Sequence, residues 1–201
     1  MGLLVLWTLL IAFGYIFLKK DIFKLMRIVR EPTMLAFATA SSESAYPKTM
    51  EALDKFGVPK RITSFVLPLG YSFNLDGSMM YMAFAVLFIA QAYNIDLSFS
   101  QQALILFTLM ITSKGIAGVS RASIVVIAST LAMFKLPEAG ILLILAIDQF
   151  LDMGRTATNV IGNSIATAVI ARTEGNKDEL TEQEGIMVNN IPPVNQLADN
   201  S

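Results

Sequence analysis

The chain has 201 residues, of which 54% are hydrophobic and 15% are charged, and its formal net charge is −1. Soluble domains carry about 25% charged residues, so this composition favours a membrane protein. The chain contains no cysteine and no histidine, which excludes a disulfide framework, a zinc–thiolate site and a catalytic triad built on imidazole. No basic surface is interleaved with exposed aromatic residues, so nucleic acid is not expected as a partner.

The first 18 residues are apolar and run directly into Lys19 and Lys20. They lack the basic start and the small-residue cleavage site of a secretory signal, so they predict a transmembrane helix, complete or nearly so. Further basic residues follow as far as Arg30, and positive charge next to a span favours the cytoplasmic side. We therefore expect residues 1–28 to form a transmembrane helix with a basic cytoplasmic end.

Two pairs of short apolar segments flank polar tips. The first pair lies within about residues 31–58, around the serine-rich residues 39–44. The second lies within about residues 100–134, around residues 113–123, which include two glycines. Each arm is too short to cross the roughly 30 Å of hydrocarbon in a bilayer, so the pattern predicts two re-entrant helical hairpins that enter from opposite sides. A simpler interpretation stays open, in which the serines are ordinary turn residues and the glycines only allow close helix packing.

The segment between the two hairpins, about residues 61–94, is long enough to span a bilayer but is interrupted. Pro68 and Gly70 weaken the helix, and the sequence Asn-Leu-Asp-Gly-Ser at residues 74–78 places a carboxylate and a glycine near its middle. Unwound backbone survives at membrane depth only where protein or a hydrated cavity satisfies it, so we expect a broken helix. The Asp76 carboxylate either caps the amides that follow it or, with freed carbonyl groups, contributes to a cation site.

The last predicted helix, about residues 137–172, carries a polar stripe. Its five members, separated by four, three, four and four positions, are Asp148, Asp152, Arg155, Asn159 and Asn163. At 100° per residue they share an arc of roughly 80°, and each charge would cost about 2.5–3.5 kcal/mol at the middle of a lipid-facing helix. This face is therefore expected to point into the protein or a hydrated cavity. The simpler interpretation is an i, i+3 pair in which Asp152 and Arg155 only neutralise each other.

In chain order the predicted elements are a span, a hairpin, a broken span, a hairpin and a span. They make an all-α integral membrane protein in which residues 29–172 form one substrate-binding domain. Residues 173–201 are polar and acidic and have little to bury, so we expect a disordered cytoplasmic tail.

Four segments carry a resemblance to a known family. They are residues 64–70 (Ser-Phe-Val-Leu-Pro-Leu-Gly), residues 74–78, the tip at residues 113–123, and residues 148–163. In order and spacing they resemble the dicarboxylate/amino acid:cation symporter family, the family of glutamate and aspartate transporters, over about residues 5–175. The resemblance implies a secondary symporter and not an enzyme. It also implies an elevator movement, two hairpins that act as gates, no cofactor, and a proton or sodium ion as the coupling ion.

The resemblance also assigns roles around the substrate. Asp152 would bind the ammonium group of an acidic amino acid, Arg155 its side-chain carboxylate, and Asn159 its backbone part. A fork-shaped guanidinium suits a carboxylate, and a nearby acid suits an ammonium. The remaining residues expected to bind substrate are Ser42 and Thr156, and Val119 and Ser120 in the second tip.

A second group of residues is expected to couple transport to a cation or a proton. Its members are Gly70, Ser72, Asn74, Asp76, Asn159, Asn163 and Glu43, and Asn74 and Asp76 would hold Na⁺ in a sodium-coupled protein. Asn163 is an amide where sodium-coupled members often carry a carboxylate, and Glu43 stands where others have serine. These departures favour proton coupling and the bacterial proton–glutamate and C4-dicarboxylate branch. The second tip also differs, because Arg121 and its neighbours replace a Pro-Gly-Ala-Gly sequence, and the role of Arg121 stays open.

Family members are longer than this chain, and their N-terminal half supplies a trimerising scaffold. We therefore expect a truncated chain that forms a homotrimer only with that half, as a multi-pass protein of a bacterial inner membrane. Asp152 favours acidic amino acids over succinate or malate. Three alternatives remain: a non-transporting fragment that assembles with full-length relatives, a channel, and an intramembrane aspartyl protease. The protease would use Asp76 with Asp148 or Asp152, but Arg155 would keep Asp152 ionised.

Overall fold

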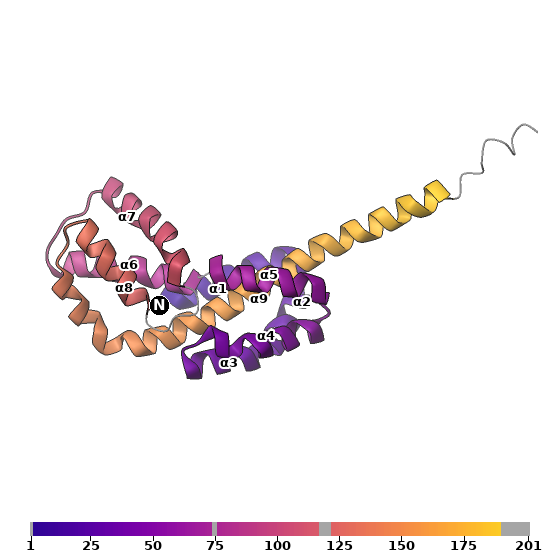
Figure 1. The fold of residues 1–201 in the computed structure, drawn as a ribbon, viewed down its shortest axis with the longest axis horizontal. Coiled ribbons are helices and arrows are strands. Elements are labelled where there is room, and N and C mark those ends of the chain that lie inside the picture. The colour runs from indigo at the N-terminus through magenta and orange to yellow at the C-terminus, as the bar shows by residue number, and fades with distance from the viewer. Residues whose placement is uncertain (1, 74–75, 117–121, 190–201) are drawn as a thin grey trace, which may run out of the picture.

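The structure is a computed structural model that describes residues 2–73, 76–116 and 122–189. Within these ranges every regular element is a helix, which agrees with the predicted all-α class. Figure 1 shows the other helices gathered along α9 (Ile141–Asn189), whose C-terminal part extends beyond them. α9 packs against α1, α3, α4, α5 and α6, so it is the axis of the molecule.

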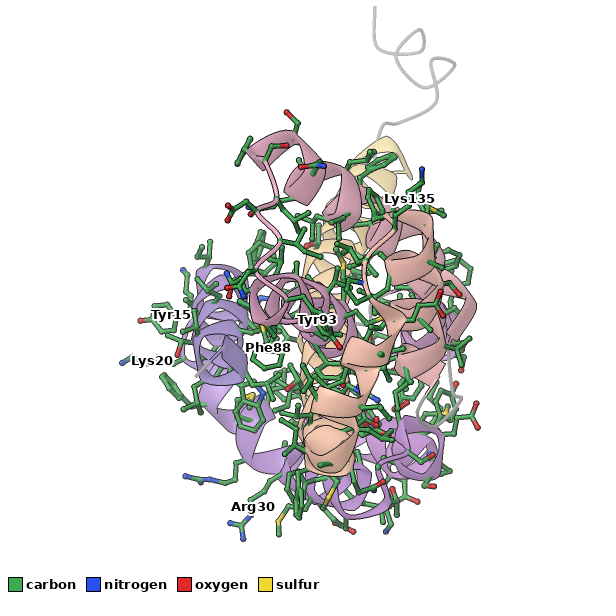
Figure 2. All side chains as sticks on the ribbon, turned by 90° about the vertical axis from the view of Figure 1, so that its left-hand side faces the viewer. Tyr15, Lys20, Arg30, Phe88, Tyr93 and Lys135 are labelled. Atoms are coloured by element: carbon green, nitrogen blue, oxygen red, sulfur yellow. The ribbon has the colours of Figure 1, made fainter. Side chains whose placement is uncertain are left out.

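The chain begins with α1 (Gly2–Leu18) and α2 (Asp21–Ile28), and the residue Lys19 between them has a φ of 50°. A left-handed residue cannot continue a right-handed helix, so the chain turns where the apolar run meets the basic run. The 17 residues of α1 make a helix about 26 Å long, close to the thickness of a bilayer core. Figure 2 shows Lys20 and Arg30 extending outward from the body of the molecule.

The first predicted hairpin consists of α3 (Arg30–Thr39) and α4 (Ser42–Phe56), which pack against each other. The turn between them is local in origin. Ala40 is left-handed, with a φ of 49°, and Ser41 is extended and acts as the N-cap of α4. The Ser41 side chain accepts a hydrogen bond of 3.3 Å from the amide of Ser44, which satisfies one of the amides left unpaired at a helix start. The serine-rich tip is therefore a capped turn, as the simpler interpretation of these serines predicts, and this does not test a role in substrate binding.

The predicted broken span contains α5 (Lys60–Phe73) and α6 (Asp76–Ala92). Residues 74 and 75 lie outside the described residues. In a continuous helix the amide of Gly77 would donate to the carbonyl of Phe73. Here each of these two groups has a partner elsewhere: the Gly77 amide donates to Asn159, and the Phe73 carbonyl accepts from Lys114.

The second predicted hairpin contains α7 (Phe99–Thr112), the short 3₁₀ helix η1 (Ser113–Ile116) and α8 (Ala122–Met133). Ser98 and Gln101 form a capping box that fixes the start of α7. A second 3₁₀ helix, η2 (Glu138–Gly140), leads into α9. The helical arms of both hairpins are therefore present, while their entry into a membrane stays a prediction.

Two hydrophobic clusters lie at different levels of α9. The first joins α6, α7, α8 and the start of α9, and its members include Met82, Ile89, Ile105, Leu109, Ile127 and Ile144. The second joins α1, α2, α4, α5 and a later part of α9, and its members include Ile22, Leu25, Leu53, Leu67, Ile161 and Ile165. The polar stripe of α9 falls mainly between these two clusters, so apolar packing on both sides fixes its position.

The outer surface of the helices is apolar. Exposed large side chains include Leu9, Phe13, Ile16, Phe65, Phe107 and Phe150. In the described part of the chain, the segment Lys60–Ala92 is long and apolar enough to cross a membrane. Length and composition alone do not distinguish such a segment from the buried helix of a soluble protein. An exposed apolar surface of this kind is unusual for a soluble monomer, so it supports a protein surrounded by lipid.

α9 continues through Thr173 to Asn189, although the sequence led us to expect a disordered tail from Thr173. The difference has a local cause, since over half of residues 174–188 are Glu, Gln, Lys, Leu or Met, which have high helix propensity. Residues 190–201 lie outside the described residues.

Candidate functional site

The polar stripe of α9 is buried. Asp148, Asp152, Arg155, Asn159 and Asn163 are each between 0% and 4% exposed. The prediction that this face points into the protein is therefore confirmed. Buried charges are stable only when they are paired and hydrogen-bonded, and the partners of these side chains define the candidate site.

Arg155 is the centre of the site. Its Nε donates a hydrogen bond of 2.9 Å to Oδ1 of Asp152, and its Nη1 lies 3.5 Å from Oδ1 of Asp148. The guanidinium carbon also lies 4.4 Å from the centre of the Tyr81 ring, a cation–π distance. The Tyr81 hydroxyl in turn donates a 2.7 Å hydrogen bond to Oδ1 of Asp148. Two carboxylates and one ring therefore hold the guanidinium.

The simple i, i+3 pair considered for Asp152 and Arg155 is present, but it is part of a larger network. Asp148 joins it from one turn earlier, and the Thr156 hydroxyl lies 3.5 Å from Asp152 Oδ1. The two carboxylates and the guanidinium therefore belong to one buried ionic network.

Asn159 ties α9 to the start of α6. Its Oδ1 accepts a 2.9 Å hydrogen bond from the Gly77 amide, and its Nδ2 donates a 3.0 Å bond to Oγ of Ser78. The approach requires a glycine, because a Cβ on residue 77 would lie 2.6 Å from the backbone oxygen of Arg155. This contact places the half-buried Asp76, the first residue of α6, next to the polar face of α9.

Asn163 makes the corresponding contact with α5. A Cβ built on Gly70 would lie 2.5 Å from Oδ1 of Asn163, so the two helices touch because residue 70 has no side chain. Ser72, one half-turn further, is half-buried and its hydroxyl donates to the carbonyl of Pro68 at 3.3 Å. The structure thus brings Gly70, Asn159 and Asn163, all expected to take part in coupling, to adjacent levels of α9.

The first hairpin reaches α9 at the same level. Ala36 of α3 and Ala45 of α4 form a small buried cluster with Val160, the residue after Asn159. Ser42, the first residue of α4, is half-buried, and Glu43 is exposed. The other expected residues, Asn74, Val119 and Ser120, and also Arg121, lie outside the described residues.

Sequence reasoning assigned no role to Tyr81. The structure buries Tyr81 in the core but also joins it to Arg155 and Asp148. A signal was available, since Ser78 and Tyr81 are three apart on one face of a helix that begins with Asp76. A second missed contact is the 2.7 Å hydrogen bond from the Trp7 indole to Oγ1 of Thr158.

The arrangement suits recognition of charged groups rather than tight binding of a transition metal. In the described ranges no group of three His, Cys, Asp or Glu side chains could hold a metal ion. A buried guanidinium can instead exchange an adjacent carboxylate for the carboxylate of a ligand, and the released carboxylate can accept hydrogen bonds from an ammonium of the same ligand.

Comparisons with known proteins agree with this chemistry. Residues 1–173 match the model of the sodium:dicarboxylate symporter family. A proton/sodium-glutamate symport protein of Bacillus caldotenax is 52% identical over 159 residues, and the proton/glutamate-aspartate symporter of Escherichia coli K12 is 51% identical over 150 residues. C4-dicarboxylate transport protein 1 of Mesorhizobium japonicum is 46% identical over 160 residues.

These three alignments cover 79%, 75% and 79% of this chain but 38%, 34% and 34% of the relatives. The chain therefore spans little more than a third of the length of these relatives. The family match extends over more than four-fifths of the chain and includes the whole polar stripe of α9. The chain belongs to the sodium:dicarboxylate symporter family, a family of transporters and not of enzymes.

Proposed function

We propose that this chain forms the substrate-binding part of a secondary symporter for acidic amino acids, with C4-dicarboxylates as the second substrate class. The observation that carries the proposal is the buried ion pair of Asp152 and Arg155 on α9. Removing three charged groups from solvent is costly, and a transporter gains from it because the same groups can bind a charged substrate away from water. The names of the three relatives support both substrate classes.

Substrate binding is an exchange of ionic partners. A substrate carboxylate replaces one of the acids at the Arg155 guanidinium, because two parallel N–H groups fit a carboxylate with both oxygens. The released Asp152 carboxylate receives the substrate ammonium, and Asn159 contacts the backbone part. Ser42, Val119, Ser120 and Thr156 complete the contacts. A C4-dicarboxylate has no ammonium, so it leaves Asp152 without this partner and binds less tightly.

Proton coupling is favoured over sodium coupling. Asn163 offers an amide where a carboxylate would hold a cation more strongly. The coupling residues are proposed to be Gly70, Ser72, Asn74, Asp76, Asn159, Asn163 and Glu43, with Asn74 and Asp76 as ligands if Na⁺ takes part. The hairpins α3–α4 and α7–α8 act as re-entrant gates around this site. The domain moves as an elevator in a bacterial inner membrane, against a trimeric scaffold supplied by the segments that the longer relatives have.

The test is uptake of labelled aspartate into proteoliposomes under an imposed proton or sodium gradient. The chain is reconstituted with and without the N-terminal part of the Escherichia coli relative. Uptake that needs both parts and follows the proton gradient supports the proposal. Absence of uptake in every combination, with the chain correctly inserted, contradicts it, and an absolute Na⁺ requirement with equal rates at pH 6 and pH 8 contradicts proton coupling.

Two variants of the same residue type separate a specific site from general damage. Arg155→Ala removes the proposed carboxylate-binding group and is expected to abolish uptake. Arg172→Ala lies on the same helix but removes only an exposed ion pair, at 4.0 Å from Asp21, and is expected to keep it. Asp152→Asn is expected to weaken aspartate binding more than succinate binding, and an unchanged preference would refute its assignment to the ammonium.

A further inference from the structure

A lysine from the second hairpin lies at the end of α5. Lys114 belongs to η1, and its Nζ donates a hydrogen bond to the backbone carbonyl of Phe73, the last residue of α5, 41 positions away in sequence. The contact is held by packing, since η1 packs against α5 as well as α7. Ser113, next to Lys114, is buried, and its hydroxyl donates a 3.2 Å bond to the carbonyl of Met110.

The end of α5 is a place where a cation is expected. The last four carbonyl groups of a helix have no amide partner within it, and they carry the negative end of the helix dipole. In α5 these carbonyls belong to residues 70–73, which include Gly70 and Ser72, two of the proposed coupling residues. Carbonyl oxygens of this kind are also the ligands that hard cations prefer.

An ammonium group and an alkali cation compete for such oxygens. The ammonium of lysine is a compact single positive charge with three donors. Once it binds the Phe73 carbonyl, a second positive charge on the same oxygen would be repelled at contact distance. Lys114 and Phe73 are both exposed, so water and salt weaken this repulsion beyond direct contact. The described geometry at Phe73 therefore fits a lysine better than a bound sodium ion.

We propose that Lys114 is a tethered cation that takes the place of one coupling ion at the C-terminal end of α5. The role of Lys114 in transport rests on the proposed symport function. The binding of its ammonium to the Phe73 carbonyl does not. Because the charge is covalently attached, this position contributes no ion to the transport stoichiometry. Lys114 is thus a residue that determines coupling-ion specificity.

The inference is tested by sodium binding to the purified full chain in detergent, with no substrate present. Thermal unfolding is measured over a series of NaCl concentrations, with choline chloride holding the ionic strength constant. Lys114→Met keeps the length and apolar stem of the side chain but removes its charge. Its stability is expected to gain a dependence on Na⁺ absent from the wild type. Above saturation, the unfolding equilibrium constant falls up to about tenfold further for each tenfold rise in Na⁺.

Lys114→Arg is the matched control, because it keeps a positive charge and several donors and should behave as the wild type. Lys114→Gln repeats the neutral variant in case the methionine variant does not fold. Equal Na⁺ dependence in the wild type and a folded neutral variant would overturn the proposal. If the neutral variant and the wild type differ in Na⁺ dependence but the wild type binds no substrate, the result would count against the proposed transport function alone.

A measurement on the wild-type chain needs no variant. Lys114 and Lys135 are both exposed, and Figure 2 shows Lys135, which follows α8, at the edge of the molecule. The Lys114 amine should be acetylated more slowly than that of Lys135, because it is hydrogen-bonded to the Phe73 carbonyl. NaCl should not speed the reaction. Labelling at the rate of Lys135, or labelling that rises with NaCl but not with choline chloride, would show that Lys114 does not hold this position.

Discussion

Gly77 allows α6 and α9 to approach closely enough for the polar network to form, so adding one methyl group there is a direct test of the site. A Cβ at residue 77 would lie 2.6 Å from the backbone oxygen of Arg155 and 2.9 Å from the Cβ of Thr158. A backbone oxygen cannot rotate away, so α6 must move by several tenths of an ångström. Gly77→Ala is therefore expected to lower the free energy of unfolding by about 1–3 kcal/mol, the usual cost of overpacking.

Gly175→Ala is the matched control on the same chain. Residue 175 also lies in a helix, but a Cβ there has nothing within 4 Å. Alanine should stabilise this part of α9, by at most about 1 kcal/mol, because it has the higher helix propensity. The same chemical change is thus expected to have opposite signs at the two positions.

Unfolding can be followed through Trp7, the only tryptophan of the chain. Its indole donates to Thr158 on α9, so its fluorescence reports the separation of α1 and α9. Denaturant titrations of the two variants in detergent micelles give the difference in stability. If the free energy of unfolding of Gly77→Ala stays within about 0.5 kcal/mol of the wild type, as for an ordinary surface substitution, then α6 and α9 do not approach each other this closely.

The same assay covers three further changes. Arg155→Met should cost about 3–5 kcal/mol, because it removes a cation that two buried carboxylates contact. Arg172→Met should cost less than about 1 kcal/mol, because it removes only an exposed ion pair, and equal losses would refute the buried network. Asn159→Ala should cost about 1–3 kcal/mol, since Ser78 loses a buried hydrogen-bond partner, and this loss should be absent if that contact does not form. Ser41→Ala should cost about 0.5–2 kcal/mol through loss of the α4 cap, and no loss would mean the turn is held by other contacts.

The sequence was sufficient to place the polar stripe, because helical periodicity converts spacing into direction. Five polar residues at intervals of three and four must share a face, and three charges on one face must leave the lipid. Their burial follows from these two rules alone. The partners of that face did not follow, since Tyr81 and Gly77 reach α9 across 67 and 82 positions of sequence. No local pattern determines which helices meet at such a distance.

The ends of the helices show the same division between local and distant causes. The turn before α4 follows from a serine that caps the helix beside a left-handed alanine, and both are local features. The continuation of α9 to Asn189 was not expected, because composition indicated how little residues 173–189 can bury but not how well they form a helix. Burial and helix formation are separate properties, so a polar segment that projects beyond the body of the molecule can form a helix without being buried.

The need to compensate buried charge links the ionic network of α9 to ion coupling. Asp148, Asp152 and Arg155 form a buried ionic group on α9. An acidic amino acid adds one negative charge and a C4-dicarboxylate adds two, and a buried site cannot hold these charges without compensation. If the proposed transport function is correct, cations are therefore expected to enter with the substrate, and a dicarboxylate is expected to require one more than an amino acid does. A fixed ammonium at Lys114 supplies part of this compensation from the chain itself, so fewer ions need to be transported with each substrate.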